Sequence, residues 1–223
     1  MTGAHLPLLV ALVIAYLAGS IPSAYLAGKL RGVDLTKHGS GNLGATNVVR
    51  VLGAPTGIAV FVVDVAKGLL PVILLPQHVA TSHPMLVALA LGVVAILGHV
   101  RSAFLGWRAG GKGVATATGV FFGLAWLPTL IAFGVWVLVF ATSGYVSLAS
   151  LMGALALPAA LAFTGSSFTD PVFIASIVIA LFVFYTHRAN IGRLRRGEEH
   201  RFRRGSKDGS SHATPPVAPQ GPR

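Results

Sequence analysis

The fold depends on residues Val114–Thr142, which read VATATGVFFGLAWLPTLIAFGVWVLVFAT. A single helix needs about 20 apolar residues to cross a membrane. This run is longer, and it contains Trp126-Leu127-Pro128, where one helix can end and another can begin. The run therefore forms either one long helix or two short helices that cross the membrane and return.

The rest of the chain is apolar as well. Of its 223 residues, 54% are hydrophobic and 10% are charged, whereas about a quarter of the residues in a soluble domain are charged. This composition predicts an all-α integral membrane protein. Five further runs approach the length of a membrane span: Leu6–Ala27, Val51–Leu75, Met85–His99, Ser147–Phe163 and Pro171–Thr186.

The positions of lysine and arginine decide between one helix and two, because cytoplasmic loops carry an excess of these residues. The N-terminus, Pro76–His83 and Thr164–Asp170 carry none. If Val114–Thr142 crosses and returns, every cation except Lys67 lies on one side. We therefore predict seven transmembrane helices, with the N-terminus outside and the C-terminus in the cytoplasm. The cations of that side are Lys29, Arg31, Lys37, Arg50, Arg101, Arg108, Lys112 and those after Thr186.

Charge and cysteine content exclude several classes of protein. The net charge is +11, but no basic-aromatic face or nucleic-acid module accompanies it, so we expect no nucleic-acid partner. The absence of cysteine excludes disulfides, thiolate catalysis and zinc–thiolate sites. The first apolar run has no basic segment or cleavage site, so it stays as an anchor. We expect residues 1–199 to form one multi-pass domain and residues 200–223 a basic, disordered cytoplasmic tail, with the signal for disorder in Gly205–Arg223. We expect the basic stretch Arg193–Arg204 to lie against anionic membrane lipids.

The first polar motif is KHGSGNLGATNVVR, residues Lys37–Arg50, in the first cytoplasmic loop. Residues 39–44 match GxGxxG, but no strand precedes them, so a dinucleotide-binding fold is excluded. Glycines let backbone N–H groups approach an anion, and Arg50 can bind phosphate through two hydrogen bonds. The alternative is a plain polar connector. The other residues expected to bind the anion are Gly39, Ser40, Gly41, Asn42, Thr46 and Asn47.

The second motif is WRAGGKGVATATG, residues Trp107–Gly119, in the next cytoplasmic loop. Residues 106–112 nearly match GxxxxGK, but glycine follows the lysine where a P-loop has the Ser or Thr that holds magnesium. We therefore predict no ATP hydrolysis, no metal and no cofactor. What remains is a glycine-lined turn at a helix N-terminus that suits an anion; the alternative is an ordinary anchor loop. Its expected ligands are Gly110, Gly111, Lys112 and Gly113.

The third motif, HRANIGRLRRGEE, follows the last span at residues 187–199. His187 and Asn190 are three residues apart, so they should share one face of a helix that continues into the cytoplasm. His187 is either a catalytic group or a surface residue. Its position beside two other anion-ready loops favours catalysis.

Two other polar features accompany the motifs. Asp64 and Lys67 lie in the second span, where they either serve function or pair with each other to hold helices together. The turn at residues 142–150 offers Ser143 and Ser147 to the site, although these hydroxyls can equally satisfy helix ends.

Together, these motifs resemble the bacterial acyl-phosphate:glycerol-3-phosphate acyltransferases of the PlsY type. The similar segments run in order from about Gly19 to Glu199. They are GSGNLGATNVVRVLG, DVAKG, GGKGVAT, SGYVSL and HRANIGRL followed by Glu199. One segment departs from the family, because GHVRSAFLGWRAGGKG has Arg101-Ser102 in place of an aromatic-Pro pair and one extra residue before Gly110.

The resemblance implies a seven-helix enzyme of the bacterial cell membrane, with its active site at the cytoplasmic face. It would transfer an acyl group from acyl phosphate to glycerol 3-phosphate, giving lysophosphatidic acid in the first step of phospholipid synthesis. A soluble enzyme that makes acyl phosphate from acyl carrier protein would be its partner. The resemblance assigns catalysis to Ser40, Arg50, Lys112, His187 and Asn190, and structural support to Glu199.

The chemistry is consistent with these residues. Acyl phosphate is an activated mixed anhydride, so the enzyme needs to bind two phosphates and orient a hydroxyl rather than supply a strong nucleophile. Either His187 or a substrate phosphate oxygen would take the hydroxyl proton. The alternative function is transport of a phosphorylated anion. A transporter would place polar residues at the bilayer midplane on broken helices, whereas here they cluster at one interface.

Overall fold

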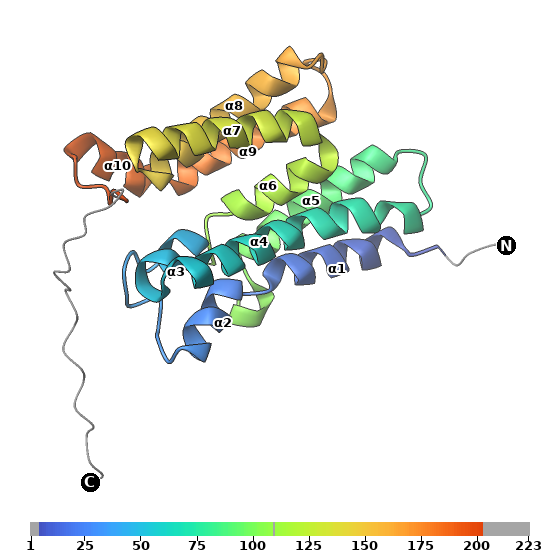
Figure 1. Ribbon diagram of the computed structural model, residues 1–223. Coiled ribbons are helices and arrows are strands. Elements are labelled where there is room, and N and C mark those ends of the chain that lie inside the picture. The colour runs from blue at the N-terminus through green and yellow to red at the C-terminus, as the bar shows by residue number, and fades with distance from the viewer. Residues whose placement is uncertain (1–4, 109, 203–223) are drawn as a thin grey trace, which may run out of the picture.

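The computed structural model describes residues 5–108 and 110–202, and within them it contains helices and no β-strand (Figure 1). Two short 3-10 helices, η1 (Pro76–His78) and η2 (Ala103–Leu105), accompany the α-helices. The α-helices are α1 (Leu8–Ser20), α2 (Ser23–Leu30), α3 (Ala45–Leu52), α4 (Ala54–Leu74), α5 (Pro84–Val100), α6 (Val114–Leu124), α7 (Trp126–Ser143), α8 (Val146–Phe163), α9 (Pro171–Thr186) and α10 (Arg188–Arg196).

The long apolar run forms two helices, α6 and α7, which separate at Ala125. The Thr129 backbone N–H (3.1 Å) and hydroxyl (2.7 Å) both donate to the Ala125 carbonyl oxygen in the first turn of α7. Pro128 lies in the first turn, where its missing N–H costs no helical hydrogen bond. The two-helix alternative is therefore the one that the structure adopts.

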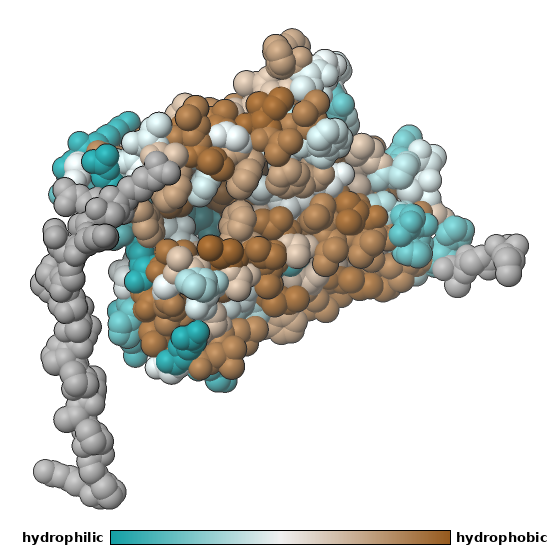
Figure 2. All heavy atoms as spheres, in the orientation of Figure 1, coloured by the Kyte–Doolittle hydropathy of each residue, from teal (hydrophilic) through white to brown (hydrophobic). Residues whose placement is uncertain are grey.

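Several helices have the length and composition of membrane spans. Four stretches qualify by themselves: Leu8–Leu30, Ala54–His78, Trp126–Ser143 and Val146–Phe163. Helices α9 and α10 qualify together, although a 58° bend separates them. Helices α5 and α6 are shorter and equally apolar. Apolar residues cover the middle of the molecule, and hydrophilic residues gather at its two ends (Figure 2).

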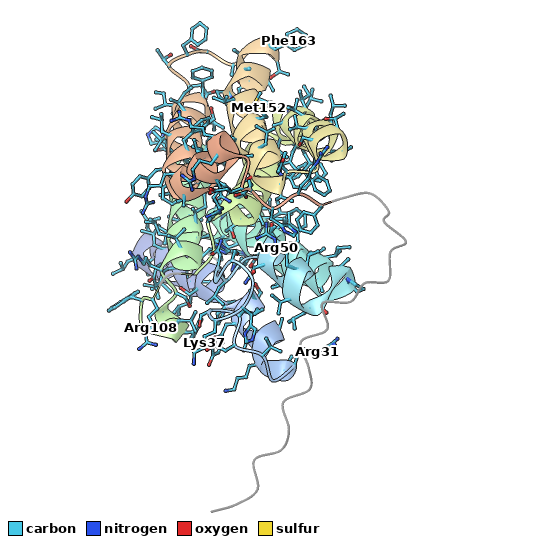
Figure 3. All side chains as sticks on the ribbon, turned by 90° about the vertical axis from the view of Figure 1, so that its left-hand side faces the viewer. Arg31, Lys37, Arg50, Arg108, Met152 and Phe163 are labelled. Carbon is cyan, nitrogen blue, oxygen red and sulfur yellow. The ribbon has the colours of Figure 1, made fainter. Side chains whose placement is uncertain are left out.

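The loops sort to the two ends of the helices. The N-terminal end, the α4–α5 connection, the α6–α7 break and the α8–α9 connection lie at one end (Figure 1). Helices α2, α3 and α10 lie at the other, where Arg31, Lys37, Arg50 and Arg108 are also found (Figure 3). The loops that bear lysine and arginine are thus gathered on one side of the molecule.

Two local features differ from the sequence analysis. Residues 45–52, which we expected to be loop and the start of a span, form the separate amphipathic helix α3, and Gly53 divides it from α4. The helix expected to continue past His187 instead bends there by 58°. The expectation of disorder from Gly205 onward lies outside the described residues.

The buried charges in α4 join three helices. Lys67 Nζ lies 2.7 Å from Asp64 Oδ1 and donates a hydrogen bond to the Ile21 carbonyl oxygen (2.9 Å). The Ser23 hydroxyl donates to Asp64 Oδ1 (2.6 Å). The His99 ring of α5 lies 3.7 Å from the same oxygen, which is longer than a hydrogen bond. These contacts hold the α1–α2 break against α4, as the packing alternative for this pair predicts.

Candidate active site

A cavity of about 320 Å³ lies between the helices, and residues from all three motifs line it. Its polar lining comes from the loops and helix ends at the cation-bearing end of the molecule. Its apolar lining comes from the interiors of α6, α7 and α8, including Phe121, Phe133, Trp136 and Leu157. One cavity therefore offers a charged region and an apolar region to the same ligand.

The structure brings most of the predicted residues to this cavity. The predicted residues that line it are Ser40, Asn42, Thr46, Asn47, Arg50, Asp64, Lys112, Gly113, Ser147, His187, Asn190 and Glu199. The predicted residues that do not line it are Gly39, Gly41, Lys67, Gly110, Gly111 and Ser143. Its lining also includes Arg193, His99 and Trp136, which the sequence analysis did not assign to the site.

Asn47 organises the first loop from within. It is 1% exposed, and its amide nitrogen donates to the carbonyl oxygens of Leu35 (3.2 Å) and His38 (3.1 Å). Its amide oxygen accepts from the Ser40 backbone N–H (2.8 Å). A Cβ on Gly39, whose φ is +63°, would lie 2.2 Å from that oxygen, so only glycine allows this approach. Asn47 and Gly39 therefore shape the loop rather than face a ligand.

Two backbone N–H groups of this loop already have hydrogen-bond partners within it. The Gly41 N–H donates to the His38 carbonyl oxygen (3.1 Å), and the Ser40 N–H is held by Asn47. These two N–H groups are therefore used within the loop, and anion binding by the remaining backbone N–H groups of the loop stays a prediction. The loop also turns the side chains of Ser40, Asn42 and Thr46 toward the cavity.

The glycines of the second loop let it lie against α5. A Cβ on Gly110 would lie 2.1 Å from the His99 carbonyl oxygen, and one on Gly111 would lie 2.3 Å from His99 Nε2. The segment before them is held to the α1 end, because the Ser102 hydroxyl donates to the Ser20 carbonyl oxygen (2.6 Å). This packing places Lys112 and Gly113 at the N-terminus of α6.

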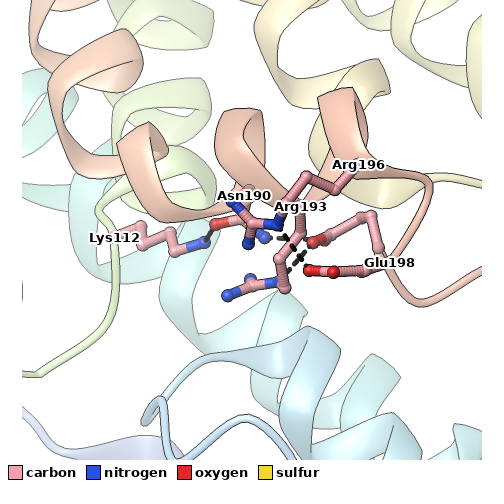
Figure 4. A network of polar contacts seen from close by, with 6 residues as sticks. Lys112, Asn190, Arg193, Arg196 and Glu198 are labelled. Carbon is pink, nitrogen blue, oxygen red and sulfur yellow. Dashed lines mark hydrogen bonds and ion pairs between the residues drawn. The ribbon is translucent and has the colours of Figure 1, made fainter.

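Lys112 is a buried cation at the cavity wall. It donates a hydrogen bond to Asn190 Oδ1 (Figure 4). Burial lowers the pKa of Lys112 to about 8, and the neighbouring Arg193 and Arg50 act in the same direction, while Glu199 opposes them. Its ammonium group can therefore bind an anion at neutral pH and loses its charge in mildly basic solution.

His187 lies at the bend between α9 and α10. Its Nδ1 donates to the Val183 carbonyl oxygen (2.9 Å), which leaves Nε2 as the nitrogen with a lone pair. Burial, together with the charge of Lys112, lowers the pKa of His187 to about 4. The ring is therefore neutral at physiological pH and can accept a hydrogen bond at Nε2.

Glu199 anchors the third motif. Its carboxylate is buried and accepts from Asn190 Nδ2 (2.7 Å) and from Arg193 Nε (2.7 Å). Burial acts to raise the pKa of Glu199, but these hydrogen bonds outweigh it and hold the pKa below its ordinary value. Glu199 therefore stays ionised and fixes which way the Asn190 amide points. Arg193 lay within a basic run, which the sequence analysis assigned to lipid contact.

Three polar atoms of residues that line the cavity lack a partner. Arg50 Nε, His99 Nδ1 and Ser147 Oγ are buried, and none has a hydrogen-bond partner among the described residues. Arg50 lies near the centre of the molecule in Figure 3, at the cavity, whereas Arg31, Lys37 and Arg108 lie at its edge. Because unsatisfied buried donors are costly, these atoms indicate a place for a ligand.

The charge of the site favours an anion. Three cations line the cavity, Arg50, Lys112 and Arg193, against the carboxylates of Glu199 and Asp64, and Asp64 is paired with Lys67. Ser143 takes no part, because its hydroxyl donates to the Val139 carbonyl oxygen (2.6 Å) at the end of α7. That is the helix-end alternative stated for this residue.

Comparisons with known proteins agree with this geometry. The family model described as glycerol-3-phosphate acyltransferase matches residues 9–197. The glycerol-3-phosphate acyltransferase of Geobacter sulfurreducens is 44% identical over 191 residues, which cover 85% of this chain and 95% of that protein. The corresponding protein of Prochlorococcus marinus (strain NATL1A) is 43% identical over 197 residues, covering 87% of this chain and 98% of that one.

Two crystal structures are similar to the whole fold. PlsY (YgiH), an integral membrane glycerol 3-phosphate acyltransferase in its glycerol 3-phosphate form, gives a TM-score of 0.80 at 41% identity and covers 87% of this chain and 95% of that chain. Its lysophosphatidic acid form gives 0.77 at 40% identity, with the same coverage. The apolar helices and these neighbours make the chain a multi-pass membrane protein. A family match over most of its length and relatives above 40% identity together show that the chain belongs to the glycerol-3-phosphate acyltransferase family.

Proposed function

We propose that this membrane acyltransferase takes its acyl group from acyl phosphate and transfers it to glycerol 3-phosphate, giving lysophosphatidic acid. The observation that carries the proposal is the joining of Arg50, Lys112 and an apolar wall in one cavity. The cations suit the phosphates of both substrates, and the apolar wall suits the acyl chain. The relatives with glycerol 3-phosphate and lysophosphatidic acid forms support the acceptor and the product.

The geometry favours direct transfer. Ser40 lines the cavity, but no described side chain that could act as a base is hydrogen-bonded to its hydroxyl, and Nδ1 of nearby His38 is engaged with the Asp34 carbonyl (2.8 Å). An activated acyl phosphate needs no serine nucleophile. The glycerol hydroxyl oxygen bonds to the acyl carbon, the bond from that carbon to the phosphate oxygen breaks, and inorganic phosphate leaves.

A substrate phosphate is the better acceptor for the hydroxyl proton. With a pKa of about 4, His187 is a weak base at neutral pH, whereas a phosphate monoester has a second pKa of about 6. His187 Nε2 then accepts the hydrogen bond of the glycerol hydroxyl and orients it. Lys112 and Arg50 balance the charge of the phosphates during the transfer.

The sidedness of the loops supports seven spans. Counting α1–α2 as one span, with α4, α5, α6, α7, α8 and α9, returns the chain to the cation-bearing end after α9. The positive-inside rule then assigns that end and the active site to the cytoplasm and the N-terminus to the outside of the cell membrane. An active site there is open to acyl phosphate from a soluble enzyme. The three motifs lie at one end of the molecule rather than at the midplane, which argues against a transporter.

The donor specificity tests the proposed function. The purified protein should form labelled lysophosphatidic acid from palmitoyl phosphate and glycerol 3-phosphate, and none from palmitoyl-CoA or palmitoyl-acyl carrier protein. Lys112→Gln, which keeps a hydrogen-bonding side chain, one bond shorter, and removes its charge, should lose at least about 100-fold in rate, as expected when a charge-assisted contact in the transition state is lost. Equal rates with acyl-CoA would refute the choice of donor.

The pKa of Lys112 predicts a basic limb in the pH profile. Its protonated form binds phosphate, so kcat/KM should fall about tenfold per pH unit above pH 8, where this cation becomes neutral. Lys112→Arg keeps its charge and should move the limb to higher pH in whatever activity remains. Lys37→Arg, at a lysine whose side chain is 78% exposed, is the control and should leave the limb unchanged. Coincident limbs in wild type and Lys112→Arg would contradict the assignment.

The topology can be tested with single cysteines, because the chain has none of its own. Thr81→Cys and Trp126→Cys should react with a membrane-impermeant thiol reagent added outside intact cells. Lys37→Cys should react only after the membrane is permeabilised. Trp126 is 65% exposed at the α6–α7 break and is the informative position. Its protection from the outside reagent would remove two spans from the count.

A further inference from the structure

The segment after α10 doubles back across the α7–α8 turn. This strap, residues Glu198–Phe202, is held at three points. Glu199 accepts from Asn190 and Arg193 (both 2.7 Å), Arg201 Nε donates to the Ser143 carbonyl oxygen (2.9 Å), and the Phe202 N–H donates to the Gly144 carbonyl oxygen (2.9 Å). The strap follows the last residue that the family model matches, residue 197.

The strap ends with an aromatic ring against Arg50. The guanidinium carbon of Arg50 lies over the Phe202 ring, 5.6 Å from its centroid. The ring is itself held edge-on by Phe140, with centroids 6.0 Å apart, and by His200, at 5.0 Å. Arg50 lines the cavity, and Phe202 does not. Phe202 thus contacts the arginine without lining the cavity.

This ring is the contact that orients the guanidinium. Arg50 Nε has no hydrogen-bond partner among the described residues, so no hydrogen bond fixes the group from that side. An aromatic face attracts a cation within about 6 Å of its centroid. A guanidinium held by a ring face uses no N–H group for that contact, so its N–H groups stay available to bind phosphate through two hydrogen bonds.

We infer that Phe202 is a positioning residue for substrate phosphate binding, acting through its cation–π contact with Arg50. The inference rests on the proposed function, which makes Arg50 a phosphate ligand. It adds that the aromatic face of the strap, outside the three motifs, sets the orientation of that ligand. Removing the face should weaken ground-state and transition-state binding equally, which raises KM and spares kcat.

The test compares two kinds of substitution at residue 202 in the full-length protein. Phe202→Leu keeps an apolar side chain and removes the aromatic face, so KM for one of the two phosphate substrates should rise about 3- to 30-fold with kcat changed less than about twofold. Phe202→Tyr and Phe202→Trp keep the face and should retain the wild-type KM. Phe168→Leu controls for loss of a ring and should leave KM unchanged, because Phe168 pairs with Phe173 and lies in the α8–α9 connection, at the end of the molecule away from α10 (Figure 1).

A second series separates this inference from the proposed function. If Arg50→Gln leaves KM for both substrates at the wild-type value, the phosphate role of Arg50 fails. If Arg50→Gln raises KM and Phe202→Leu does not, only the positioning role fails. In the Arg50→Gln background, Phe202→Leu should have no further effect, and additive effects would contradict the inference. Should Phe202→Leu not fold, Phe140→Leu frees the same ring; it should raise KM, and an unchanged value would contradict the inference.

Discussion

The site depends on the two hydrogen bonds of the Asn190 side-chain amide. Its amide oxygen accepts from Lys112, and its amide nitrogen donates to Glu199. A lysine can only donate and a carboxylate can only accept, so the amide has one orientation. This single side chain of α10 therefore joins the strap to the second loop, whose Lys112 lies 78 residues earlier in the sequence. Asn47 does the same within the first loop, where one buried amide holds three backbone groups.

These two amides are neutral, so they hold the loops in place without cancelling the positive charge of the site. Glu199 neutralises part of the positive charge without contacting Arg50, and the buried Asp64–Lys67 pair is balanced within itself. What remains is an excess of cations beside an apolar wall, at the end of the helices where lysine and arginine gather. In the proposed function, acyl phosphate would place its phosphate beside these cations and its acyl chain along the apolar wall. Charge and position, rather than a reactive side chain, would then account for the proposed chemistry.

The sequence predicted the helices well because their apolar runs are long and end at glycine, proline or charged residues. The break in Val114–Thr142 followed from the one-sided distribution of cations, and the resemblance identified the family that the comparisons show. Helix α3 was missed because an eight-residue amphipathic helix has too few turns to distinguish it from a polar loop. The inward direction of Asn47, the contact of Arg193 with Glu199 and the return of Phe202 onto Arg50 depend on tertiary folding. No local pattern encodes them.

In the proposed reaction, the acyl group passes directly from bound acyl phosphate to the hydroxyl of bound glycerol 3-phosphate, without a covalent enzyme intermediate. The most direct measurement mixes the enzyme with radiolabelled palmitoyl phosphate in the absence of glycerol 3-phosphate, denatures it, and maps any label by peptide. Direct transfer predicts unlabelled protein, together with sequential rather than ping-pong kinetics when both substrates are present. Label retained on the peptide that contains Ser40 would contradict it.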